Sequence, residues 1–152
     1  MDNLETIYQQ VINDHNINPF NYYKMAEPTH YAKGANPSRG DEVEVYLKIE
    51  DDTIKECSFV GGGGAVFSAS CSIMMTIIEG KTTAEALIAF EKFVNLLTNP
   101  AIEPNEDIYG KMVVFAGIRK FPARVKCASL PWFTMKAAIE GTKETVSTEF
   151  IM

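Results

Sequence analysis

Cysteine is scarce in this sequence, and long apolar runs are missing. The 152 residues contain three cysteines, an odd number that does not suggest a disulfide framework. The N-terminal stretch MDNLETIYQQ is acidic and amphipathic, unlike a basic, apolar secretory leader. No stretch approaches the roughly eighteen consecutive apolar residues of a membrane span. We therefore expect free thiols in a reducing cytoplasm.

Positive charge is also in short supply. Lysine and arginine number 14 against 20 aspartates and glutamates, which gives a formal net charge of -6 at pH 7. A general attraction to nucleic acid or to an anionic membrane needs clustered positive charge. The composition therefore predicts no nucleic-acid partner and no membrane partner.

The sequence does contain enough apolar residues for a core. Their share is 46%, and a chain of this length can bury a core without disulfides or metal. We expect one domain over residues 1–152.

The hydrophobic pattern predicts an α+β fold. Alternating residues over 43–49 and 54–60 indicate two strands joined by a turn at Asp51-Asp52, and a short edge strand is expected near residues 29–33. Helical spacing predicts helices over residues 4–17, 65–78, 84–97, 109–118 and 130–140, the last with Pro131 in its first turn. This gives a small antiparallel sheet against a layer of about five helices, followed by a loosely packed tail from Gly141.

Cys127 stands out because of its neighbours. Lys120, Arg124 and Lys126 precede it, and the pattern places it where an apolar helix begins. Positive neighbours and the unpaired amides of a helix N-terminus both stabilise a thiolate. The sequence therefore predicts a reactive Cys127, whereas Cys57, inside a strand, is interpreted as a small packed residue.

Two further segments are interpreted as the other walls of a pocket around Cys127. They are NPSRGDE (residues 36–42) and FVGGGGAVFSAS (residues 59–70). The four glycines open a helix, so their amides could bind an anion, but the lysine and hydroxyl residue of a P-loop are absent. The alternative is a tight turn that lets two backbones approach closely.

The chain resembles the NifU/IscU family of iron–sulfur cluster scaffold proteins, and its SufU branch above all. The resemblance runs from about Ile7 to Gly141 and rests on four blocks of sequence: VINDHNINPFN, NPSRGDEV, the glycine loop with SASCSIMMTIIEGK, and GIRKFPARVKCASLPW. The first block matches the family's opening at Asp14, His15, Pro19 and Asn21. The family implies the same α+β fold and a non-enzymatic role in cluster assembly.

The resemblance also implies a site of three cysteines and one aspartate around zinc or a nascent iron–sulfur cluster. Asp41 and Cys127 occupy two of these positions, but Arg39 and Gly64 stand where the other two cysteines are expected. One thiolate and one carboxylate are half a site. Cys71 lies seven residues beyond Gly64, about 10 Å along a helix, and is not a convincing substitute.

An ion pair could replace the missing metal. We expect the guanidinium of Arg39 to bind Asp41 or the Cys127 thiolate by a charge-assisted hydrogen bond. His15 is interpreted as a helix-end packing residue rather than a ligand.

The resemblance implies a cysteine desulfurase of the SufS type as partner, with sulfur passed to the position that is now Arg39. Three readings remain open. The protein could serve cluster assembly as a scaffold or sulfur acceptor through Cys127, assisted by Lys126 and Arg124. It could be a binding module that regulates or competes for the desulfurase. It could, third, carry another ligand at the glycine loop.

Overall fold

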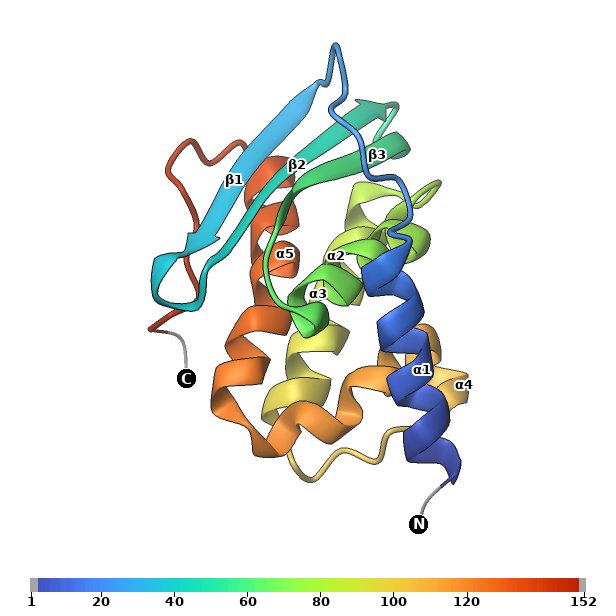
Figure 1. The fold of residues 1–152 in the computed structure, drawn as a ribbon. Coiled ribbons are helices and arrows are strands. Elements are labelled where there is room, and N and C mark those ends of the chain that lie inside the picture. The colour runs from blue at the N-terminus through green and yellow to red at the C-terminus, as the bar shows by residue number, and fades with distance from the viewer. Residues whose placement is uncertain (1–2, 151–152) are drawn as a thin grey trace.

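A computed structural model describes residues 3–150. In chain order the elements are α1 (Asn3–Ile17), β1 (His30–Asn36), a 3₁₀ turn η1 (Pro37–Arg39), β2 (Asp41–Glu50), β3 (Thr53–Gly62), α2 (Ala65–Ile78), α3 (Thr83–Thr98), α4 (Glu106–Tyr109), a 3₁₀ helix η2 (Gly110–Lys120) and α5 (Pro122–Glu140) (Figure 1).

The three strands form one antiparallel sheet in the order β1-β2-β3. Asp51 and Asp52 make the predicted turn between β2 and β3, with φ angles of 52° and 59°. Two positive φ angles in succession give the type I′ turn, whose twist matches that of a hairpin. The predicted hairpin is confirmed, and β1 is an edge strand of seven residues, two longer than expected.

One face of the sheet is covered by helices. α5 packs on β1 and β2, α2 packs on β3, and α3 packs on α5 (Figure 1). Trp132 of α5 is fully buried and stacks on Phe93 of α3 with ring centroids 4.6 Å apart. The architecture is the predicted α+β arrangement, with the core between the sheet and these helices.

The last helix begins earlier than the sequence suggested. It starts at Pro122, not near Leu130, so Pro131 lies inside α5 and not in its first turn. Proline cannot donate to the carbonyl four residues earlier, which belongs to Cys127. Packing compensates nearby: the buried Ser70 hydroxyl donates to the carbonyl of Ala128 at 2.6 Å.

The C-terminal tail is also ordered, contrary to expectation. Val146 pairs in parallel with Gly34 on the open edge of β1, through hydrogen bonds with the backbone of Lys33 and Ala35. Thr148 is completely buried. Sequence patterns missed this segment because it has no repeat of its own and gains its order from the strand beside it.

The segment predicted as a buried helix over residues 109–118 is the 3₁₀ helix η2, residues 110–120, and several of its side chains are indeed buried. Over residues 3–150, no helix has the length and apolarity needed to cross a membrane.

Candidate functional site

Asp41 lies at the start of β2 and is almost completely buried, with 1% of its surface exposed. Its Oδ1 atom accepts a hydrogen bond of 3.2 Å from the backbone amide of Gly64. Its Oδ2 atom has no hydrogen-bond partner among the described residues. A buried carboxylate oxygen without a hydrogen-bond partner lowers the stability of the fold. Its presence therefore indicates a functional role for Asp41.

The glycine loop is shaped around this carboxylate. A Cβ atom on Gly63 would lie 2.1 Å from Asp41 Oδ1 and 2.7 Å from the ring of Phe67. A Cβ atom on Gly61, at φ 140°, would lie 2.1 Å from the carbonyl oxygen of Glu42. These close contacts match the alternative of a tight turn in which two backbones approach closely. The Gly64 amide donates to the Asp41 carboxylate of the same chain. By contrast, a Cβ atom on Gly64 would meet nothing within 4 Å.

Cys127 lies in the second turn of α5, half-buried and beside Asp41. Burial, and then the Asp41 carboxylate, raise the pKa of its thiol to about 12, while the positive charge of Arg39 acts in the opposite direction. The predicted thiolate is therefore wrong for the isolated chain. The helix begins five residues earlier, so the unpaired amides of its first turn do not reach the sulfur.

The basic residues that precede Cys127 point elsewhere. The guanidinium of Arg124 lies over the ring of Phe121, 4.7 Å from its centroid, and both residues line a cavity beside α1 together with Lys120. Arg39 is exposed at the end of η1. Within residues 3–150, the expected hydrogen bond from Arg39 to Asp41 is not formed, since Oδ2 has no partner and Oδ1 accepts from Gly64.

The loop that carries Arg39 is fastened by the C-terminal tail. Asn36, fully buried, donates to the Thr148 hydroxyl at 2.8 Å, and that hydroxyl donates to the carbonyl of Lys126 at 2.7 Å. The carboxylate of Glu149 accepts from both the amide and the hydroxyl of Ser38. The tail thus connects the loop that carries Arg39 to the helix that carries Cys127. No pattern in the sequence predicts this connection.

Of the other cysteines and histidines, Cys71 interacts electrostatically with this group: burial, and then the Asp41 carboxylate, raise the pKa of its thiol. Cys57 is buried in β3, as predicted, and Cys71 is buried in α2. His15 lies at the end of α1 with its Nδ1 atom 2.7 Å from the Ser72 hydroxyl, in agreement with a packing role. His30 contacts the neighbouring Thr29 hydroxyl.

The donor set of the site is too small for zinc or a cluster. A protein zinc site uses three or four ligands, and clusters are held mainly by thiolates. Among residues 3–150 no group of three or more histidine, cysteine, aspartate or glutamate side chains is placed to hold a metal ion. Asp41 and Cys127 supply two donors, so the residues of this chain do not by themselves fit either group.

Comparisons with known proteins agree with the resemblance seen in the sequence. The zinc-dependent sulfurtransferase SufU of Bacillus subtilis is 32% identical over 137 residues, covering 90% of this chain and 92% of that protein. The iron–sulfur cluster assembly scaffold protein IscU of Streptococcus pyogenes is 29% identical over 140 residues, covering 92% and 87%.

A solved structure has the same fold. The putative iron–sulfur cluster assembly scaffold protein for the SUF system of Fervidobacterium islandicum superposes with a TM-score of 0.80 at 32% identity, covering 89% of this chain and 98% of that one. The model of the NifU-like N terminal domain matches residues 7–128. This chain belongs to the family of the NifU-like N terminal domain.

Proposed function

We propose that this protein is an accessory of iron–sulfur cluster assembly, of the SufU and IscU type, that binds a cysteine desulfurase and regulates or competes for it. In this proposal it does not hold zinc or a cluster with its own residues alone. The assignment to iron–sulfur cluster assembly is supported by relatives that are named as a zinc-dependent sulfurtransferase and as a cluster assembly scaffold.

The observation that carries the proposal is the composition of the site. Asp41, the glycine loop and Cys127 lie together, while Arg39 and Gly64 stand at the two positions where the family resemblance expects thiolates. The guanidinium of Arg39, which acts on Cys127, repels a divalent cation there, because arginine stays protonated in proteins.

Restoring the two cysteines tests the proposal directly. The structure leaves room for a side chain on Gly64, and Arg39 is exposed. We expect elemental analysis to find well under one zinc or iron per chain in the wild type, with no change in Cys127→Ser. The double variant Arg39→Cys/Gly64→Cys should gain about one zinc, the complement of a four-ligand site. One metal per wild-type chain, lost in Cys127→Ser, would refute the proposal.

Binding to the desulfurase is measured separately. Titration calorimetry with the cysteine desulfurase of the same organism should give saturable binding to the wild type and equal binding to Cys127→Ser. In activity assays, the protein should lower the stimulation of the desulfurase by an intact SufU-type scaffold. Absence of binding would contradict the regulatory role even where the metal result agrees.

The second candidate is a sulfur acceptor that uses Cys127. One observation favours it: the sulfur is only half-buried and lies under the influence of the Arg39 charge. Incubation with desulfurase and cysteine, followed by alkylation and mass spectrometry, distinguishes the two candidates. The regulatory proposal predicts no persulfide, because a thiol with a raised pKa is a poor nucleophile at neutral pH. A persulfide lost in Cys127→Ser would favour the acceptor.

A further inference from the structure

A cavity of about 330 Å³ lies between α1, η2 and the start of α5, on a different part of the surface from the residues of the candidate site. Its floor is apolar and includes Tyr8, Ile12 and Ile118. Cavities of this size, with an apolar lining and a few polar groups, are typical of small-molecule sites.

The η2 wall explains why the space is open. Ala116 and Gly117 line it with the two smallest side chains, and a Cβ atom on Gly117 would meet nothing within 4 Å. The 3₁₀ helix runs for 11 residues, whereas 3₁₀ runs longer than about four residues are uncommon. The hollow is thus built by the backbone and by small residues.

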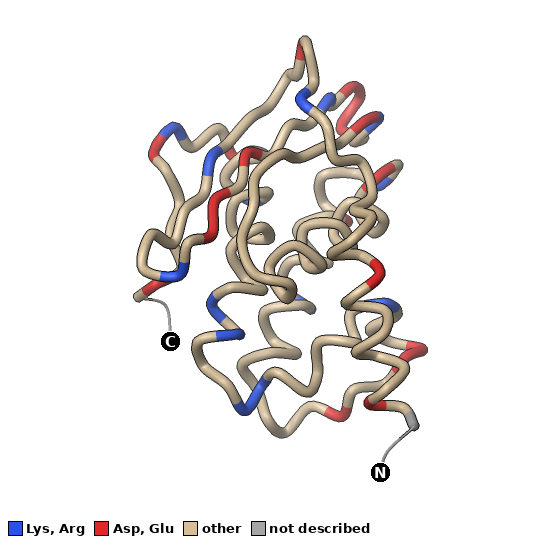
Figure 2. Tube along the Cα trace, in the orientation of Figure 1, with Lys and Arg blue, Asp and Glu red and all other residues tan. Residues whose placement is uncertain are grey.

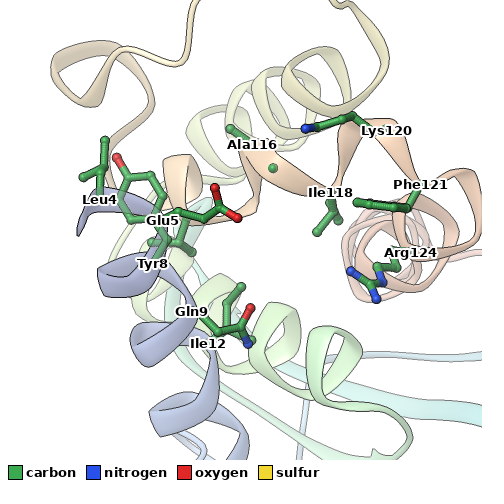
Figure 3. A pocket seen from close by; sticks show the side chains of 12 residues that line it. Leu4, Glu5, Tyr8, Gln9, Ile12, Ala116, Ile118, Lys120, Phe121 and Arg124 are labelled. Carbon is green, nitrogen blue, oxygen red and sulfur yellow. The ribbon is translucent and has the colours of Figure 1, made fainter. Parts of the chain in front are cut away.

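Charged side chains reach the cavity from opposite sides. Figure 3 shows Glu5 extending from α1 and Lys120 and Arg124 from the facing wall. Arg124 is held over Phe121, which limits its freedom before any ligand arrives. Neither Lys120 nor Arg124 pairs with a carboxylate among the described residues. Two unpaired cations beside an apolar floor are notable in a chain of net charge -6.

We propose that this cavity binds a small monocarboxylate with an apolar body, the carboxylate meeting Arg124 and Lys120 and the body lying on Tyr8, Ile12 and Ile118. The planar guanidinium matches a carboxylate in bidentate geometry. Glu5 reduces the local charge from two positive to one, which favours a monoanion over a phosphate dianion. The proposal is independent of the proposed function.

The test uses hexanoate as the probe and the full chain labelled with ¹⁵N. Amide spectra recorded during titration should show saturable shifts in α1, η2 and the start of α5. Acetate lacks the apolar body and hexan-1-ol lacks the charge, so each should bind at least about tenfold more weakly than hexanoate.

Two variants remove the two parts of the site. Arg124→Gln should weaken hexanoate binding about tenfold or more, since a charged hydrogen-bonding partner is lost. Gly117→Leu should fill the cavity and abolish binding. Lys92→Gln, exposed on α3, is the matched control and should bind as the wild type does.

Three results would overturn the proposal. They are the absence of saturable shifts with hexanoate, equal binding of hexan-1-ol and hexanoate, and full retention of binding in Arg124→Gln. If Gly117→Leu does not fold, the exposed Arg124→Gln variant and the ligand series still decide the question.

Discussion

At the scale of single residues, Asp41 is the most informative position. A carboxylate that is 99% buried has one oxygen on the Gly64 amide and one with no partner within residues 3–150. The family resemblance predicts a metal ligand at this position. The second oxygen is desolvated and has no hydrogen-bond partner among the described residues, so the residue should weaken the fold.

Asp41→Asn should therefore stabilise the protein in the presence of a chelator. The amide oxygen can still accept from Gly64, and the unpaired negative charge is removed. We expect a gain of about 1–2 kcal/mol, which for a chain of this size raises Tm by roughly 2–8 °C. Scanning calorimetry in EDTA measures it, with Asp107→Asn on the exposed α4 as the control.

The opposite result would also be clear. In that case Asp41→Asn lowers Tm, and lowers it more with added zinc than with EDTA. That result would mean that the Asp41 carboxylate binds a metal together with ligands other than Cys127.

At the scale of elements, α5 and the tail depend on each other. α5 carries Pro131 in its interior, and the Thr148 hydroxyl of the tail donates to the carbonyl of Lys126 a little more than one turn earlier. The same hydroxyl accepts from Asn36, which precedes η1. The tail therefore stabilises the two segments that carry Arg39 and Cys127.

Thr148→Val should destabilise the fold strongly, although valine has nearly the same shape as threonine. It removes the hydroxyl between Asn36 and Lys126, so the buried Asn36 amide and the Lys126 carbonyl keep only their long direct hydrogen bond of 3.5 Å, at a cost of about 1–3 kcal/mol. Urea unfolding followed by circular dichroism checks this. Thr145→Val, exposed in the same tail, should change stability by less than about 0.5 kcal/mol. Equal stability of the two variants would show that the tail is not an integral part of the fold.

The docking of α1 is expected to depend on pH. Burial, and then the positive charge of Lys111, lower the pKa of His15 below 6.5, with Asp14 acting in the opposite direction. The unfolded chain then takes up a proton more readily than the folded one. Stability is fully present above pH 6.5 and is lost as the pH falls below it. His15→Gln should flatten this part of a Tm-versus-pH curve, and an unchanged slope would contradict the assignment.

The elements also show what the sequence could and could not provide. The alternation in β2 and β3 and the Asp51-Asp52 turn follow local rules, and they were predicted correctly, whereas β3 extends through Gly61 and Gly62 of the predicted glycine loop. Pro131 was misread because a proline at N1 and a proline inside a packed helix look alike in sequence. The placement of the tail on β1 depends on long-range contacts without a local pattern.

The site divides in the same way. The family resemblance singled out Asp41 and Gly64, the basic neighbours singled out Cys127, and the structure places Asp41 beside both. The direction of the Cys127 pKa shift was predicted wrongly, because the basic sequence neighbours were counted, whereas burial of the thiol and then the Asp41 carboxylate raise its pKa. The role of Gly63, which leaves room for the Asp41 carboxylate, has no sequence signal because Asp41 is distant in the chain.

At the scale of the whole molecule, the distribution of charge is uneven. Figure 2 shows basic residues on the first turns of α5, on a chain with more acidic than basic residues, and Arg39 is the one basic residue of the loop before β2. Hydrogen bonds from Ser38, and then the charges of Arg39 and Lys126, lower the pKa of the Glu149 carboxylate. A partner that docks over Cys127 would meet this basic surface.

If the desulfurase binds there, its association should depend on charge. The double charge reversal Arg39→Glu/Lys126→Glu should lower the association rate constant about tenfold or more at low salt, because complementary charges accelerate the encounter of two proteins. The association rate of this variant should also fall less steeply as the ionic strength rises. Lys55→Glu/Lys143→Glu makes the same change in net charge on exposed positions of β3 and the tail. Surface plasmon resonance in a salt series compares the two. Equal slowing by both variants would mean that net charge alone controls the association rate. Slowing only by Arg39→Glu/Lys126→Glu would place the docking surface around Cys127.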